Sequence, residues 1–183
     1  MTPATVSGRC PKPPESWDRR IRDTLRAGAR ALRRWADTDE ELRDFGDLAE
    51  LVAFVHRRDR VCEADRILFW LVCRASTDDL AARTVLACMM PGAKNLMCCY
   101  LWAHADADDS ATSVLEAMWE RIRTYPCERR PAKIAANIQL DTRQRISRRA
   151  AREKHRESAC WCRELVHARF RGDSGQLADY EST

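Results

Sequence analysis

Apolar residues recur along this chain at intervals of three and four, which is the spacing of one face of an α-helix. Ser16, a residue type that caps helices, opens the first such stretch. The apolar positions of that stretch are Trp17, Ile21, Leu25, Ala29, Leu32 and Trp35. A second stretch opens at Thr38, where Glu41 three residues later completes a capping-box pattern. This second helix is expected to carry Leu42, Phe45, Leu48, Val52 and Val55.

The middle of the chain is its most apolar part. A third helix is expected over 62–75, and residues 80–103 are expected to form a pair of helices that Pro91 breaks or kinks. The acidic stretch 105–110 is suited to capping the next helix, which is expected over 108–124. The N-terminal helices should then cover the apolar stretch 80–103.

The last part of the pattern is a long polar helix with a thin apolar stripe. Tyr125 and Pro126 end the helix before it, and Pro131 suits its first turn. It is expected to continue past Arg149 towards Phe170. No segment of any length alternates with the period of a strand. The chain is therefore predicted to be all-α, a single compact bundle of six to seven helices.

Four parts are expected along the chain. Residues 1–15, with four prolines, predict a flexible N-terminal arm, and 16–76 an N-terminal helical extension. A central helical domain is expected over 77–150, followed by a C-terminal helix and tail over 151–183. Three tryptophans are expected as core or near-core anchors, namely Trp70, Trp102 and Trp119.

The location of the protein is expected to be cytoplasmic. The N-terminal residues hold no apolar signal core. The longest apolar run, 96–103, is far shorter than the roughly 20 residues of a membrane helix, so no membrane contact is expected. The nine cysteines are odd in number and lie mostly on apolar helical faces, which favours reduced thiols over a disulfide framework.

Four residues between positions 155 and 167 are of types that bind zinc. These weak metal candidates are His155, Cys160, Cys162 and His167. Residues two apart on a continuous helix point about 200° apart, so one ion could not bind both cysteines. Zinc would require the helix to break near Ala159, and no metal or other cofactor is expected.

Catalysis is not expected. The chain has no Gly-rich phosphate loop, no His-Glu-x-x-His and no glycine-flanked serine elbow of the Gly-x-Ser-x-Gly type. No nucleophile and acid accompany any of the four histidines, which are His56, His104, His155 and His167. The prediction is a protein that is not an enzyme.

Charge is distributed unevenly along the chain, which carries +4 overall. Residues 121–171 hold fifteen Lys/Arg against five Asp/Glu, whereas 37–50 hold seven acidic residues against Arg43 alone. Such asymmetry indicates a polyanion partner for the C-terminal third, and a solvated arginine-rich helix is the alternative.

Two segments carry a resemblance to a known family. An acidic start at Asp106-Ala-Asp-Asp opens a helix with Trp119 near its end. After a short loop follows Ile134-Ala135-x-Asn137-x-x-x-Asp141-x-Arg143 with trailing arginines. Over about residues 79–149 the chain resembles region 2 of bacterial RNA polymerase sigma factors, especially the extracytoplasmic-function type. The resemblance implies a sigma region 2-like core and a transcription regulator that binds RNA polymerase and promoter DNA.

The resemblance also implies which residues would make contact. The helix over 106–123 would dock on the clamp helices of the largest polymerase subunit through exposed residues, namely Ser113, Glu116, Ala117 and Glu120. The last helix would face the promoter −10 element, and its DNA-binding residues would be Lys133, Asn137, Asp141, Arg143, Arg145, Arg148 and Arg149. Asn137 could bond a base edge, and arginines bind phosphate or guanine. Asp141 could accept from a cytosine amino group, hold an arginine in place, or pair with Arg145 at i,i+4.

The chain departs from the family in two places. The loop 126–133 has no aromatic beyond Tyr125 at its edge, which puts strand opening in doubt. Only 34 residues follow Arg149, so the −35-reading domain is expected to be absent. Two alternatives stay open. One is a helical interaction module that kept the sigma scaffold without promoter recognition, with a protein regulator as a further partner. The other is a zinc-stabilised DNA-binding protein.

Overall fold

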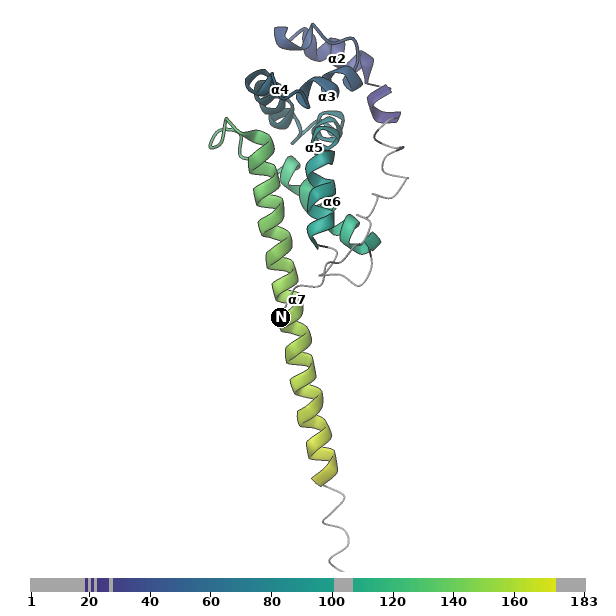
Figure 1. Ribbon diagram of the computed structural model, residues 1–183, viewed down its shortest axis with the longest axis vertical. Coiled ribbons are helices and arrows are strands. Elements are labelled where there is room, and N and C mark those ends of the chain that lie inside the picture. The colour runs from purple at the N-terminus through teal and green to yellow at the C-terminus, as the bar shows by residue number, and fades with distance from the viewer. Residues whose placement is uncertain (1–18, 20, 22, 27, 101–106, 174–183) are drawn as a thin grey trace, which may run out of the picture. The chain divides into compact units, whose positions relative to one another are not determined.

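The computed structural model describes residues 19, 21, 23–26, 28–100 and 107–173 (Figure 1). Among these residues every regular element is a helix, which confirms the predicted all-α fold. The elements are α2 (Ala29–Ala36), η1, a 3₁₀ turn (Glu40–Leu42), α3 (Leu48–Val55), α4 (Val61–Arg74), α5 (Asp79–Tyr100), α6 (Ala107–Arg123) and α7 (Ile134–Asp173). The chain divides into two compact units, residues 1–146 and residues 147–183.

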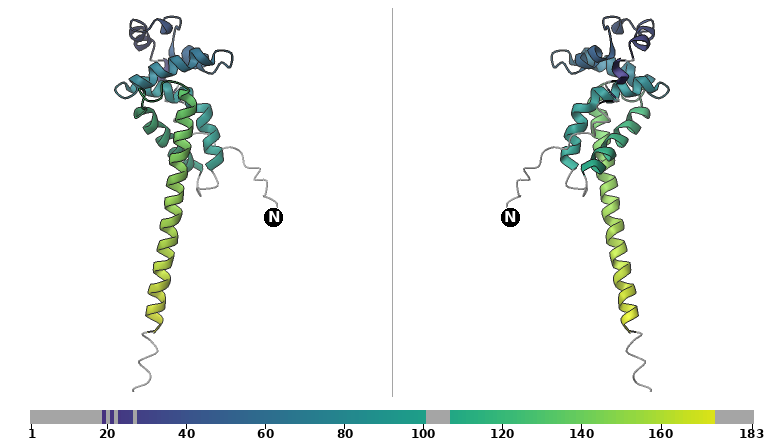
Figure 2. Two further views of the ribbon diagram at one scale, coloured as in Figure 1. Left: turned by 90° about the vertical axis from the view of Figure 1, so that its left-hand side faces the viewer. Right: turned by 90° about the vertical axis from the view of Figure 1, so that its right-hand side faces the viewer.

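The core of the first unit is built around α5. This helix lies against α3, α4 and α6 (Figure 2). One buried apolar cluster joins side chains from α2 through to the start of α7, where Ile134, Ile138 and Ile146 point inward. Helices α3 and α4 therefore pack on α5, as the apolar stripes of the N-terminal part predict.

Helix α5 runs through Pro91 as one element, so a break into two helices, one of the two outcomes expected there, is wrong. Pro91 itself is exposed. A proline inside a helix costs about 3 kcal/mol. Burial of Met89, Ala93 and Met97 on the same helix outweighs that cost, since each fully buried methionine contributes about 1.5–3 kcal/mol.

The expected helix from Thr38 is also wrong, because the chain forms η1 and then starts again at α3. Asp39 caps η1 by accepting from the Glu41 amide at 3.0 Å, while the Thr38 hydroxyl donates to the carbonyl of Arg34. At the start of α3, Asp47 accepts from the Glu50 amide at 2.8 Å. The Glu50 carboxylate in turn accepts from the Gly46 amide at 2.8 Å. This reciprocal cap at Asp47 is the stronger start signal.

Tryptophans anchor the N-terminal helices to the core. Trp35 is 3% exposed, donates from Nε1 to Asp78 at 3.2 Å, and meets the Trp70 ring edge-on with centroids 5.6 Å apart. Trp70 and Trp119 are partly buried against the core, as expected of anchors. Trp102, the arm over 1–15, Trp17 and His104 lie outside the described residues.

Cysteine chemistry differs from expectation at one position. Cys98 is disulfide-bonded, so the expectation of reduced thiols is wrong there. The thiols of Cys62, Cys73, Cys88, Cys99 and Cys127 are free. Cys88 is fully buried, and burial raises the pKa of its thiol to about 12. In the described part of the chain, no helix is both long and apolar enough to cross a membrane.

The second unit is described by the helical residues of α7 from 147 to 173. Arg148 and Arg149 are exposed there, and Arg156 pairs with Glu153 at 3.6 Å. The helix reaches Asp173, which confirms its predicted extension past Arg149 towards Phe170. It continues across Ala159, so the break that a zinc site required is not found. No cluster of metal-binding side chains occurs among the described residues, which leave out the side chains of Cys160, Cys162 and His167.

Candidate functional site

The start of α7 is held by a carboxylate from another helix. Asp65 of α4 accepts from the amide of Lys133 at 2.6 Å and from that of Ile134 at 2.7 Å. Helix starts leave such N–H groups without partners, and an anion there also meets the positive end of the helix dipole. Lys133 has a φ of 57°, a left-handed conformation uncommon for lysine. Asp65 therefore determines where α7 begins.

Pro131 does not lie in the first turn of α7, so that expectation is wrong. The helix begins three residues later, at Ile134, because the cap is supplied by tertiary contact with Asp65. Residues 124–133 form the connecting loop, called the α6–α7 loop below. Pro131, Ala132 and Lys133 are exposed in it.

Asn137 ties the first turn of α7 to this loop. Its side-chain amide donates to the Tyr125 hydroxyl at 3.0 Å and to the Ala132 carbonyl at 2.9 Å. The Tyr125 hydroxyl donates in turn to the Arg130 carbonyl at 3.0 Å. Burial raises the pKa of Tyr125, so this hydroxyl stays protonated at neutral pH. Both amide hydrogens of Asn137 are thus used inside the protein.

Asp141 lies between two arginines. Arg121 of α6 approaches its carboxylate at 2.5 Å, and Arg130 of the α6–α7 loop approaches it at 2.9 Å. The Arg121 guanidinium also lies over the Tyr125 ring, 5.3 Å from the centroid. Three roles were considered for Asp141, and the one seen in the structure is that it holds arginines in place. Its i,i+4 pair with Arg145 is not formed, because Arg145 pairs with Glu120 of α6 instead.

The exposed charged residues at the start of α7 and in its loop are mostly cations. Arg129, Lys133, Arg143 and Arg145 are exposed, as is Arg130. Residues 129–146 hold five Lys/Arg against Asp141 alone, a local excess of four positive charges. Leu140, 61% exposed, lies on the same helix. These five exposed cations, Arg129, Arg130, Lys133, Arg143 and Arg145, are called the α7 cationic surface below, although Arg143 and Arg145, two residues apart on one helix, point in different directions.

The side chains expected to contact polymerase are placed unequally on α6. Glu116 and Glu120 are exposed and Ser113 is partly exposed. Ala117 is only 6% exposed and belongs to the core cluster, so its expected exposure is wrong. The sequence stripe of this helix held Ala111, Val114, Leu115, Met118, Trp119 and Ile122, and the buried side of α6 is wider because it also includes Ala117.

The sequence did not predict the roles of three side chains in this region, namely Asp65, Arg121 and Arg130. Asp65 lies far from α7 along the chain, so no local pattern marks it as a cap. Arg121 and Arg130 belong to the basic stretch 121–171, yet their charge alone did not identify Asp141 as their shared partner.

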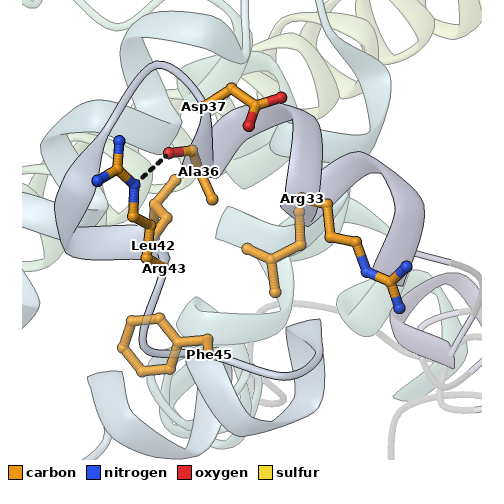
Figure 3. A pocket seen from close by; sticks show the side chains of 7 residues that line it. Arg33, Ala36, Asp37, Leu42, Arg43 and Phe45 are labelled. Carbon is orange, nitrogen blue, oxygen red and sulfur yellow. Dashed lines mark hydrogen bonds between the residues drawn. The ribbon is translucent and has the colours of Figure 1, made fainter.

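A separate depression of about 350 Å³ lies beside α2 (Figure 3). It is lined by Leu32, Arg33, Ala36, Asp37, Leu42, Arg43 and Phe45. Arg43 donates from Nε to the Ala36 carbonyl at 3.2 Å and pairs with Glu40 at 3.0 Å. None of the lining residues comes from α7 or the α6–α7 loop, and the depression lacks the paired acid and base that catalysis would need.

No protein-family model matches this chain, and no curated protein or solved structure shows significant similarity to it.

Proposed function

We propose that this chain is a sigma factor-like transcription regulator that binds RNA polymerase and promoter DNA, with the basic helix α7 on the DNA side. The observation that supports the proposal most is the fixed start of α7. Asp65 holds the start of the helix, and Asn137 and Asp141 hold the loop through contacts that meet at Tyr125 and Arg130. The α7 cationic surface is thereby carried on a rigid support, which suits a charged ligand.

Phosphate contact is the role proposed for the exposed cations. Lys133, Arg143 and Arg145 belong to the first unit, and the proposal adds Arg148 and Arg149 of the second unit. Each phosphate neutralised releases counterions and adds about 0.9 to the slope of log affinity against log salt. Such contacts bind DNA with little regard to sequence.

Asn137 and Asp141 are given a positioning role in this proposal. The donors of Asn137 are engaged by Tyr125 and Ala132, and the Asp141 carboxylate by Arg121 and Arg130. If either residue contacted a DNA base, it would have to give up these bonds. Each partner left without a hydrogen bond would cost about 1–3 kcal/mol where it is buried. We therefore assign the two residues to holding the loop.

Polymerase docking is proposed for the exposed edge of α6. This edge leaves three side chains accessible, those of Ser113, Glu116 and Glu120. Ala117 is buried and is not part of the proposed contact. Acidic residues at this edge would meet a basic partner surface. A Glu116→Arg variant should reduce co-purification of RNA polymerase and leave DNA affinity unchanged.

The test of DNA binding compares two variants that lose equal charge. In the first, four arginines become alanine, namely Arg143, Arg145, Arg148 and Arg149. In the control, four exposed arginines of α2, the α3–α4 turn and α5 become alanine, namely Arg33, Arg34, Arg58 and Arg83. Fluorescence anisotropy with promoter-length duplex is measured at several salt concentrations. The first variant should lower the salt slope by up to about 3.6, and the control should lower it far less. Equal slopes in the two variants would refute the assignment of α7 to DNA.

A second candidate function is a helical interaction module without promoter recognition. It is favoured by the ion pairs of Arg145 with Glu120 and of Arg130 with Asp141, which neutralise part of the cationic surface internally. Polymerase co-purification without any salt-dependent DNA affinity would select this function over the first.

A further inference from the structure

Helix α2 and the helical residues before it carry arginines on their outer side. Residues 19, 21 and 23–26 are helical, and α2 follows at Ala29. Their inner side packs on the core through apolar side chains, namely Ile21, Leu25, Leu32 and Trp35. Their outer side exposes five arginines, called the N-terminal arginine face below, namely Arg19, Arg26, Arg30, Arg33 and Arg34. The last three share one side of α2, because they are spaced at i, i+3 and i+4.

The charge of this face is not neutralised by the fold. Within the described part of the chain, the side chains of the N-terminal arginine face form no ion pair and no hydrogen bond. The acidic residues that follow at 37–50 have other partners. Glu40 pairs with Arg43 at 3.0 Å. Glu41 pairs with Arg66 at 2.9 Å. An uncompensated positive surface of this kind attracts an anionic partner.

The depression beside α2 adjoins this face. Arg33 lines it on one side and Arg43 on another (Figure 3). The Arg43 guanidinium is already bonded to the Ala36 carbonyl and to Glu40, so Arg33 is the cation open to a ligand there. The remaining lining is apolar apart from Asp37, and it consists of Leu32, Ala36, Leu42 and Phe45. At about 350 Å³ the depression is at the small end of ligand-sized pockets, which suits one bulky side chain.

The order of charges along this surface favours a peptide over a nucleic acid. The arginines end at Arg34, and Asp37, which is exposed, lines the depression. A nucleic acid is negative along its whole length, so phosphates that passed from the arginines to the depression would meet Asp37 and Glu40. A peptide can instead place carboxylates opposite the arginines and an uncharged side chain beside Asp37.

We propose that the N-terminal arginine face and the depression bind an acidic segment of a protein partner. Carboxylates of the segment pair with Arg30, Arg33 and Arg34, since the guanidinium fork binds a carboxylate through two parallel hydrogen bonds. One bulky apolar side chain of the segment fills the depression, as an anchor does in helix-in-groove recognition. This binding needs neither DNA nor polymerase, so the inference stands apart from the proposed function.

The experiment titrates the full chain into a labelled synthetic helical peptide in which glutamates flank a central phenylalanine, and follows fluorescence anisotropy. One companion peptide has alanine in place of the phenylalanine, and another has lysines in place of the glutamates. The alanine peptide should bind about tenfold more weakly, near the lower end of what burial of a phenylalanine contributes. The lysine peptide should not bind. Affinity for the first peptide should fall as salt is added, because surface ion pairs are screened.

Two variants separate the arginines from the depression. The combined change Arg30→Ala, Arg33→Ala and Arg34→Ala should weaken binding by about tenfold or more, since each exposed ion pair contributes a factor of about 1.5–5. A control that loses the same charge changes three exposed arginines outside this face to alanine, namely Arg58, Arg83 and Arg129, and should bind as the wild type does. Ala36→Leu fills the depression and should weaken binding of the phenylalanine peptide but not of its alanine companion.

Four results would overturn the inference. The first is a wild-type chain that does not bind the phenylalanine peptide, and the second is a wild-type chain that binds the phenylalanine and alanine peptides equally. The third is equal affinity of the two triple variants for the phenylalanine peptide. The fourth is loss of duplex DNA affinity in the variant of the arginine face to the same extent as loss of peptide affinity, because the partner would then be a nucleic acid. The first two results use the wild-type chain, so the proposal can fail even if a substitution disrupts the fold.

Discussion

Removing the carboxylate of Asp65, which lies on α4, should loosen the start of α7 although no residue of α7 is changed. In Asp65→Ala the amides of Lys133 and Ile134 lose acceptors at 2.6 and 2.7 Å. Loss of an N-cap acceptor costs about 1 kcal/mol and up to about 2. Hydrogen bonds to a charged acceptor contribute about 1.5–3 kcal/mol, but the Lys133 amide is exposed enough for water to replace part of that.

We therefore expect Asp65→Ala to lower the free energy of unfolding by about 1–2 kcal/mol. For a chain of this size each kcal/mol corresponds to about 2–4 °C in Tm, so Tm should fall by about 2–8 °C. Asp65→Asn keeps one acceptor oxygen and loses the charge, and should lie between the variant and the wild type.

Thermal unfolding followed by circular dichroism measures this change, and hydrogen exchange locates it. The amide of Asn137, which donates to the Lys133 carbonyl at 2.9 Å, should exchange faster in Asp65→Ala. Asp44→Ala removes an exposed aspartate of the N-terminal region and is the matched control. If Asp65→Ala and Asp44→Ala had the same Tm and the same exchange at Asn137, the capping role of Asp65 would be refuted.

Three further outcomes follow from named contacts. Asp141→Asn leaves Arg121 and Arg130 with a neutral acceptor and should lower the free energy of unfolding, measured by urea denaturation, by about 1–3 kcal/mol. An unchanged free energy of unfolding would mean that these ion pairs are screened by water and contribute nothing to stability. Gly28→Ala places a Cβ 2.0 Å from the fully buried Leu48 side chain, so it should destabilise by about 1–3 kcal/mol despite the better helix propensity of alanine; a rise in Tm would contradict this. The Cys88 thiol has its pKa raised to about 12 by burial, so its stabilising contribution is complete below about pH 9 and is lost as pH rises towards 12. Cys88→Ala should flatten that alkaline loss, and an unchanged pH profile of Tm would count against it.

Local patterns predicted several elements closely. Helix α6 (Ala107–Arg123) and α4 (Val61–Arg74) match the expected ranges within one residue at each end, because a clear apolar stripe and a nearby turn mark both. The pattern failed at Thr38, where the Asp47 cap competes with the capping box that Thr38 begins. It failed at Pro91 because burial along α5 outweighs the local cost of a proline, and burial is not a local property.

The candidate site shows the same division. The basic excess in the C-terminal third and the apolar positions of α7 can be read in one dimension, since charge and period are properties of neighbouring residues. Which carboxylate meets which arginine cannot, and Asp141 proved to hold Arg121 and Arg130 where the helix spacing suggested Arg145. Ala117 is a further case, because its burial depends on how widely the core covers α6.

The amino-acid sequence alone determined that this chain is helical, where most of its helices lie and that its positive charge gathers towards the C-terminal third. These properties follow from hydrogen bonds, side-chain periods and charges within a few residues. Only the tertiary structure decided where α7 begins and which partners engage Asn137 and Asp141. Each of these depends on groups far apart in the chain, which come together only when burial of the apolar faces sets the helices against one another.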